Sequence, residues 1–344
     1  MKKSNYLWLI LLVAGTALIL LRQNGIISWG EGRSYHNDKG LIFGTMYSIT
    51  YEHDKSLKLD IDKRLLLFDA SLSMFNDTSV ISRINQNEDV IADSLFVNVF
   101  RQAMKISEST DGSFDITVAP LVNAWGFGFT KSENANPDKA KIDSLLQIVG
   151  WQKVHLTPEG KVVKQDPRIT LDCSAIAKGY AVDVIANLLR GEGVQNFMVD
   201  IGGEVVVSGA NPSGELWRIG ISKPDDDPES RNQDLQTILK ITNSGIATSG
   251  NYRNFYFRDG MKYAHTIDPK TGYPVQHSIL SSTVIAKDCM TADAYATAFM
   301  VMGLERASAL VEQHSELEAY FIYGDENGNY KTYMTDGMKK FVTK

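Results

Sequence analysis

A strand-to-helix junction at residues 168–183 is the feature that most restricts how this chain can fold. Its sequence, RITLDCSAIAKGYAVD, contains β-branched residues that predict a short strand over 169–171. Ser174 is placed to accept hydrogen bonds from the first turn of the helix that follows, and Gly191 is expected to end that helix as a left-handed residue. Apolar residues recur through it at the helical period: Ile176, Tyr180, Val184, Ile185, Leu188 and Leu189.

The same junction carries chemistry that suits a phosphate. Asp172 follows the predicted strand, and Lys178 lies about one turn into the helix. A helix start offers unpaired N–H donors and a partial positive charge, to which Lys178 adds an ammonium group. Phosphates commonly bind at such points. A capped helix start beside a solvated aspartate is the alternative, because such junctions are frequent in chains that mix strands and helices.

The composition is that of a globular protein and argues against a nucleic-acid partner. Of the 344 residues, 43% are hydrophobic and 22% are charged, and the formal net charge is -6. The length fits one domain or two. No basic run is present that could hold a polyanion, so nucleic acid is excluded as a partner.

The N-terminus has the pattern of a membrane segment. Lys2 and Lys3 precede an uncharged apolar run from Ser4 to Leu21, which Arg22 closes. That run is near the lower limit for a spanning helix and longer than an ordinary signal-peptide core. We therefore expect an uncleaved anchor over 1–22, with a cleaved signal peptide as the alternative. Everything after Arg22 is then exported, and no cysteine is near enough for this to be a lipoprotein.

Residues 23–39 are polar and predict a tether, which leaves 40–344 as the folded domain. Asp259-Gly260 between two strand-like segments predicts a hairpin within 254–267, followed by a rigid proline-containing loop after His265. Strands are expected in LIFGTMYSITYEH, which begins at Leu41 and continues around Gly44, in FMVDIGGEVVVSG and in WRIGISKP. Helices are expected at 57–72, 96–110 and 142–149, in DCMTADAYATAFMVMG ending at Gly303, and from Leu304 to about His314.

Two polar residues four positions apart point to a cation site. Asp293 and Thr297 share one face of a predicted helix, so their oxygens can converge on one ion. A surface pair is the ordinary alternative for this spacing. Because Asp293 is polar and near the helix start, its removal is expected to leave the fold intact.

Several motifs together resemble the ApbE family of FAD:protein FMN transferases. They follow one another from about Leu41 onward: DGSFDITVAPLVNAWGFG, LDCSAIAKGYAVD, DIGGE, ATSGNYRNF, HTIDPKTGYPV and MTADAYATAF. The resemblance implies a single two-lobed α+β domain with FAD in a cleft.

The resemblance also implies roles for individual residues. Mg²⁺ would be held by the carbonyl of Ala175 and the side chains of Asp293 and Thr297, a set of oxygen ligands that suits this ion. Asp172 and Lys178 would contact FAD. The remaining residues implied to bind the nucleotide are Met46, Phe75, Ala124, Trp125, Gly126 and Ile267.

The implied reaction is transfer of FMN from FAD to a Ser or Thr hydroxyl of an acceptor protein, with release of AMP. His265 is the candidate base, because an unperturbed histidine titrates near neutrality and the loop after it is rigid. Acceptors would be flavin-carrying subunits of membrane redox complexes, and the catalytic domain would lie on the periplasmic side of a bacterial cytoplasmic membrane. A Mg²⁺-dependent FAD pyrophosphatase and a membrane-tethered flavin-binding protein without turnover are the alternatives.

The two cysteines test this arrangement. Cys173 is two residues before Ala175, and Cys289 is four before Asp293, so one shared ion would draw both segments together. We therefore expect the cysteines to be neighbours, either joined in a disulfide or packed as two buried thiols.

Overall fold

The computed structural model describes residues 34–128, 136–224, 234–251, 255–258, 261–325 and 329–343. The anchor expected over 1–22 lies outside these residues. Within the described ranges, every helix is too short or too polar to cross a membrane.

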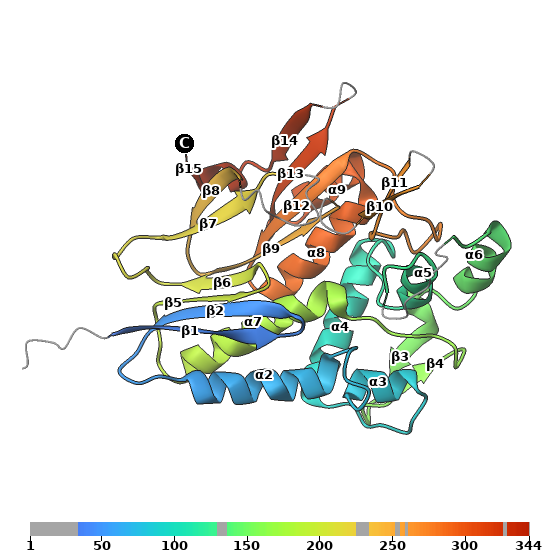
Figure 1. Ribbon diagram of the computed structural model, residues 1–344, viewed down its shortest axis with the longest axis horizontal. Helices are drawn as coiled ribbons and strands as arrows, with labels where there is room; N and C mark the ends of the chain where they lie inside the picture. The colour runs from blue at the N-terminus through green and yellow to red at the C-terminus, as the bar shows by residue number, and fades with distance from the viewer. Residues whose placement is uncertain are drawn as a thin grey trace, which may run out of the picture.

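A sheet of eight antiparallel strands forms the centre of the molecule (Figure 1). Its edge strand begins at Tyr35. The prediction that residues 35–39 belong to a tether is therefore wrong, because they pair with β2 in the sheet. Phe43 and Gly44 both have positive φ and form a tight hairpin turn where one continuous strand was predicted. In spatial order the strands are β1 (Tyr35–Ile42), β2 (Thr45–Glu52), β5 (Phe197–Ile201), β6 (Glu204–Ser208), β9 (Ser244–Gly250), β12 (Ile279–Ala286), β13 (Glu318–Gly324) and β14 (Tyr330–Met334).

Two helices cover one face of this sheet, and further helices pack outside them (Figure 1). The inner pair is α7 (Ser174–Gly191) and α8 (Cys289–Met302), which contact each other closely. Their apolar side chains share one core with sheet residues such as Val206, Ala247 and Val284. The outer helices are α2 (Lys58–Leu72), α3 (Val80–Asn85) and α4 (Ser94–Ser109), whereas α9 (Leu304–Gln313) contacts both α8 and strand β13.

A three-stranded sheet covers the opposite face. It consists of β7 (Trp217–Ser222), β8 (Leu235–Ile241) and β15 (Val342–Thr343). The 3-10 turn η2 (Met338–Lys340) comes directly before β15 in the chain. Val205 and Val207 of β6 pack against this second layer, whereas Val206 points to the helices. Strand β6 is therefore apolar on both faces because both are covered.

A smaller core lies beside the main sheet. It holds Leu121, Trp125, Ile142, Val149 and Ile267. The mixed α+β class expected from the sequence is confirmed. The elements that contribute to this core include α5 (Ala119–Ala124), α6 (Lys139–Leu146) and the hairpin β10 (Phe255–Arg258)–β11 (Met261–Ala264). After α6 come η1 (Trp151–Lys153) and the hairpin β3 (Val154–Leu156)–β4 (Val162–Lys164), whose apolar side chains pack against the main core.

The junction at 168–183 differs from its predicted form. Residues 169–171 form no strand, because the side chain of Asn85 takes both backbone hydrogen bonds of Leu171, at 2.8 and 2.9 Å. Ser174 is the first helical residue and no cap; its N–H donates to Asp172 Oδ1 at 2.8 Å. The helix runs through Gly191, and the left-handed residue after it is Gly193.

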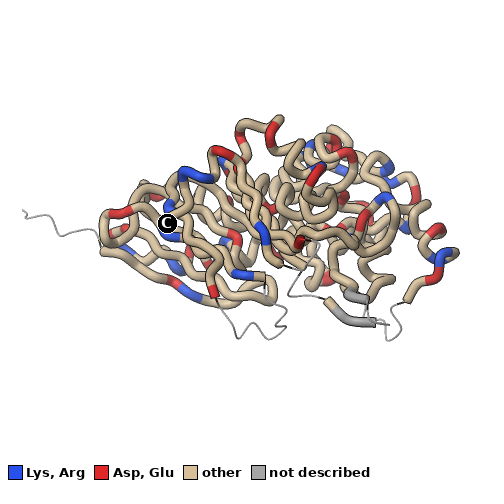
Figure 2. The backbone as a smooth tube through the Cα atoms, turned by 90° about the horizontal axis from the view of Figure 1, so that it is seen from above, with Lys and Arg blue, Asp and Glu red and all other residues tan. Residues whose placement is uncertain are grey.

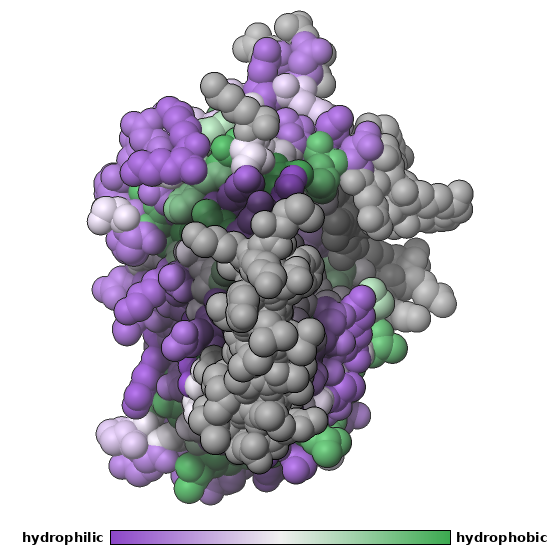
Figure 3. Space-filling view, turned by 90° about the vertical axis from the view of Figure 1, so that its left-hand side faces the viewer, coloured by the Kyte–Doolittle hydropathy of each residue, from purple (hydrophilic) through white to green (hydrophobic). Residues whose placement is uncertain are grey.

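Surface charge agrees with the composition. Figure 2 shows Lys and Arg interspersed with Asp and Glu along the backbone, in keeping with the absence of a basic run. On the face seen in Figure 3, the described side chains are mainly hydrophilic, and apolar ones occur in small groups.

Candidate functional site

A cavity of about 670 Å³ opens where the start of α7 meets α8 and the turn between β5 and β6. This size is typical of small-molecule sites. Its walls also come from the β1–β2 turn, the loop after α2, strands β7 and β9, and the segment after β11. Eight predicted site residues line it: Phe75, Asp172, Ala175, Lys178, His265, Ile267, Asp293 and Thr297.

The other four predicted residues are not among those that line the cavity: Met46, Ala124, Trp125 and Gly126. Met46 is 71% exposed on the β1–β2 hairpin, and its carbonyl accepts from Gly202 N–H at 3.0 Å. Trp125 is buried, stacks on Tyr263 and donates from Nε1 to the carbonyl of Gly272 at 2.8 Å. The Trp125 side chain therefore belongs to the smaller core, and its predicted contact with the nucleotide stays a prediction.

Asp293 is a buried carboxylate fixed by the neighbouring helix. Its Oδ2 accepts from Gly179 N–H at 2.9 Å. The helices approach this closely because residue 179 has no side chain; a Cβ there would lie 2.3 Å from the carbonyl oxygen of Cys289. Burial raises the pKa of Asp293, which the Lys178 ammonium opposes. Asp293 is 3% exposed, so the alternative of an exposed surface pair is wrong. That the fold survives removal of this side chain stays a prediction.

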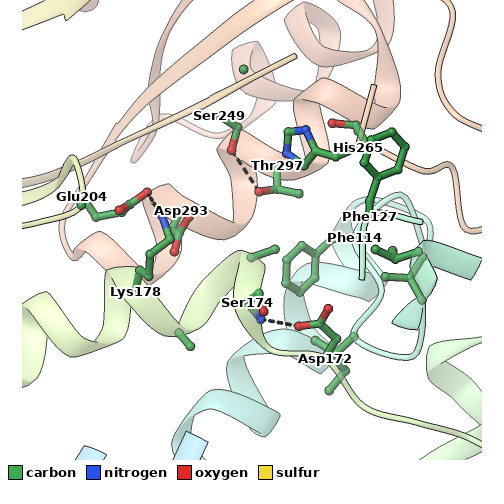
Figure 4. A pocket seen from close by; sticks show the side chains of 18 of the residues that line it. Phe114, Phe127, Asp172, Ser174, Lys178, Glu204, Ser249, His265, Asp293 and Thr297 are labelled. Atoms are coloured by element: carbon green, nitrogen blue, oxygen red, sulfur yellow. Dashed lines mark hydrogen bonds and ion pairs between the residues drawn. The ribbon is translucent and has the colours of Figure 1, made fainter. Parts of the chain in front are cut away.

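Thr297 lies one turn further along α8, and its hydroxyl is hydrogen-bonded to that of Ser249 on β9 at 3.0 Å (Figure 4). Both residues line the cavity. Ser249 was not predicted. The only signal for it was its place inside the ATSGNYRNF motif.

Lys178 forms an ion pair with a residue that sequence reasoning missed. Its Nζ lies 2.5 Å from Oε1 of Glu204, whose side chain is 4% exposed (Figure 4). Burial raises the pKa of Glu204 to about 7, against the effect of the ammonium. Burial lowers the pKa of Lys178, but Glu204 and Asp293 outweigh it, so the net pKa is raised. The signal for Glu204 was an acid directly after two glycines at the start of an otherwise apolar strand.

Asp172 and His265 complete the polar lining. Asp172 turns back onto the first N–H of α7, and burial raises its pKa. His265 comes directly after β11, in the segment that the sequence predicted to be rigid. Its ring meets Phe127 edge-on, with centroids 6.4 Å apart, and Figure 4 shows both side chains beside the cavity.

Both cysteines are free and buried. The alternative of two buried thiols is therefore confirmed over the disulfide. Burial raises the pKa of each thiol, and Cys289 Sγ lies 3.3 Å from the carbonyl oxygen of Ile246, to which it donates.

Comparison with known proteins shows which family the chain belongs to. The ApbE family model matches residues 43–321, which contain the described cavity-lining residues. The chain belongs to the ApbE family. Membership in the ApbE family, predicted from the motifs, is thereby confirmed, and with it the chain's status as an enzyme.

Individual ApbE relatives are similar over most of their length. A protein of Vibrio cholerae named FAD:protein FMN transferase is 38% identical over 315 residues, covering 89% of this chain and 92% of the relative. A protein of the same name from Escherichia coli is 33% identical over 88% of each chain. The structure titled flavin transferase ApbE from Vibrio cholerae superposes with a TM-score of 0.81 at 34% identity, covering 90% of this chain and 99% of that one.

Proposed function

We propose that this enzyme transfers FMN from FAD to a Ser or Thr hydroxyl of an acceptor protein and releases AMP. The observation that carries the proposal is the convergence of Lys178, Asp293, Thr297 and His265 on one cavity. The relatives named FAD:protein FMN transferase support it, because the chain covers about nine-tenths of their length.

The reaction exchanges one P–O bond for another. The acceptor oxygen bonds to the FMN phosphorus, the bond between that phosphorus and the bridging oxygen breaks, and AMP leaves with the bridging oxygen. The hydroxyl proton must be removed as the new bond forms, because a neutral alcohol is a poor nucleophile. His265 is the base in this proposal. The edge-on contact with Phe127 holds its ring at the cavity wall.

Lys178 and the start of α7 serve the diphosphate. The ammonium group points to the same cavity as the first turn of the helix, so both favour negative charge there. Charge on the leaving AMP is stabilised by the same groups, which is where catalysis of phosphoryl transfer mostly acts.

The residues present fit a Mg²⁺ ion. Asp293, Thr297 and the carbonyl of Ala175 offer oxygen ligands, which Mg²⁺ prefers. Two buried carboxyl groups, Glu204 and Asp293, face one ammonium, and Glu204 Oε2 is buried with no hydrogen-bond partner in the described structure, so the site has room for further positive charge. The described residues hold no cluster of three His, Cys, Asp or Glu, so phosphate oxygens would complete the shell. When bound, the ion would neutralise charge on the diphosphate.

The acceptor and the location follow from the same proposal. The apolar run at 4–21 supports a membrane anchor, with the catalytic domain on the periplasmic side of a bacterial cytoplasmic membrane. Flavin-carrying subunits of membrane redox complexes are the proposed acceptors, because they would present their hydroxyls at the same surface.

Co-expression with candidate acceptor subunits tests the proposal. Intact mass spectrometry of the acceptor should show a gain equal to FMN minus water, and chelation of Mg²⁺ should abolish that gain. AMP formed from FAD without any acceptor would instead indicate a pyrophosphatase. Tight FAD binding without AMP at every Mg²⁺ concentration would indicate a binding protein, and would overturn the proposed activity.

A further inference from the structure

The pair of Glu204 and Lys178 is built from two rigid elements. Glu204 is the first residue of β6 and directly follows Gly202 and Gly203, both with positive φ. The turn is held by a hydrogen bond from Gly203 N–H to Asp200 Oδ1 at 3.0 Å. Lys178 projects from the second turn of α7. The carboxylate therefore has a fixed position, whereas the ammonium sits at the end of a flexible chain with four rotatable bonds.

Fold stability does not explain this ion pair. Glu204 is 3% exposed, and a buried carboxylate loses more hydration than one ion pair commonly restores. The three residues that follow it are Val205, Val206 and Val207, so an apolar residue would suit the strand better. Its Oε2 is also buried without a hydrogen-bond partner among the described residues, which adds to the cost.

The surroundings of Lys178 explain what the carboxylate does. The titratable groups that face the ammonium are Glu204 from β6 and Asp293 and Cys289 from α8. Without Glu204, the carboxylate that remains among these described groups is Asp293, the proposed cation ligand. The ammonium would then be drawn toward Asp293 and would compete with the cation for it.

We propose that Glu204 is a positioning residue that holds the Lys178 ammonium toward the diphosphate of FAD and keeps it away from Asp293. This inference rests on the proposed function. It assigns Glu204 an effect on FAD that passes entirely through Lys178.

A double-mutant cycle tests that dependence. Glu204→Gln, Lys178→Met and the double variant are compared by FAD affinity, measured by flavin fluorescence, and by AMP release in the presence of Mg²⁺ and acceptor. Glu204→Gln alone should weaken FAD binding about tenfold to a hundredfold, the range for one charged hydrogen bond. In the Lys178→Met background the same change should cause no further loss, or should tighten binding, because it removes a carboxylate that repels the diphosphate.

Equal losses in both backgrounds would overturn the inference, since Glu204 would then contact FAD itself or serve only the fold. Glu204→Asp, which keeps the charge on a shorter side chain, should retain more affinity than Glu204→Gln. If Glu204→Gln does not fold, this aspartate variant with and without Lys178→Met gives the same comparison.

Asp62→Asn is the matched control. It breaks the ion pair between Lys58 and Asp62, whose charged atoms are 2.8 Å apart. Neither residue lines the cavity, so FAD affinity should be unchanged. Two kinds of failure can be told apart. If the proposed function is wrong, the unmodified enzyme forms no AMP and no flavinylated acceptor. If only the positioning role is wrong, the unmodified enzyme is active and the losses of FAD affinity in the two single variants add up in the double variant.

Discussion

The backbone N–H of Gly179 on α7 donates to the carboxylate of Asp293 on α8, and this contact is possible only because the two helices nearly touch. A methyl group at residue 179 would meet the backbone of Cys289 and the Cβ of Asp293 at less than 3 Å. The glycine thus sets the spacing of the helices and, through it, the position of the proposed cation ligand.

Gly179→Ala should therefore destabilise the enzyme by about 1–3 kcal/mol, the usual cost of overpacking, and should lower FMN transfer. Urea unfolding and AMP release measure the two effects. Gly191→Ala is the control in the same helix, because a Cβ there meets nothing within 4 Å. That variant should be as stable as the parent or more stable, and an equal loss in both variants would show that spacing is not the cause.

Asp293→Asn should reduce activity at least about a hundredfold, since the amide can still accept from Gly179 but lacks the charge that attracts a cation. Thr297→Val should raise the Mg²⁺ concentration needed for half-maximal rate, because only a neutral oxygen is lost. Ser249→Ala leaves the Thr297 oxygen in place and should have the smallest effect. Full activity of Asp293→Asn in limiting Mg²⁺ would contradict the metal assignment.

His265→Ala should slow transfer about a hundredfold to ten-thousandfold at saturating FAD, the usual contribution of a general base. The FAD dissociation constant should change little. His155→Ala is the control, since His155 is exposed on β3 and does not line the cavity. A large loss of FAD affinity with normal turnover would make His265 a binding residue.

Stability should fall as pH rises through the titration of Asp183. Its two carboxylate oxygens accept from the N–H groups of Cys289 and Met290 at the start of α8, yet burial raises its pKa to about 7. The folded state then keeps a proton that the unfolded state releases near pH 4, so raising the pH from about 4 to 7 favours unfolding, by up to about 4 kcal/mol.

Comparison with Asp183→Asn isolates this effect from those of other buried carboxylates. The stability difference between parent and variant should change between pH 5 and pH 8 in favour of the variant, because its amide does not titrate. Urea unfolding at both values measures it. A difference that is independent of pH would show that Asp183 has an ordinary pKa in the folded enzyme.

The thiols of Cys173 and Cys289 should resist a water-soluble disulfide reagent in the folded enzyme and react fully after unfolding. Both are buried, and burial raises both pKa values, so little thiolate is present near neutral pH. Reducing agent should leave the melting temperature unchanged. A shift on reduction would indicate a disulfide.

Local patterns in the sequence predicted the elements that local physics determines. The period of apolar residues placed α2 at 57–72, within one residue of its observed start. The predicted end of α8 at Gly303 is confirmed, and this residue has positive φ. Asp293 and Thr297, which the spacing placed on one helix face, both line the cavity, and their convergence on one ion stays a prediction. These features depend on neighbours within a turn or two of the helix.

The errors arose where distant segments decide the structure. β1 looked like a tether because YHNDKG is polar, but an edge strand needs only one buried side, and its partner β2 supplies the hydrogen bonds. Residues 169–171 looked like a strand, but Asn85 takes the hydrogen bonds of Leu171. Glu204 was missed because its significance depends on Lys178, which belongs to a different element.

The strand order has a consequence for how the enzyme is made. β9 pairs with β12, and α8 packs on both, so the middle of the sheet is completed by residues 279–302, near the end of the chain. Synthesis proceeds from the N-terminus. A chain that stops before residue 289 therefore has Lys178 and Glu204 but lacks Asp293 and Thr297, together with the helix that covers α7 and β9. Truncated products of this enzyme should be inactive and aggregation-prone rather than partly active, because the reaction centre is completed only after the ribosome has passed residue 297.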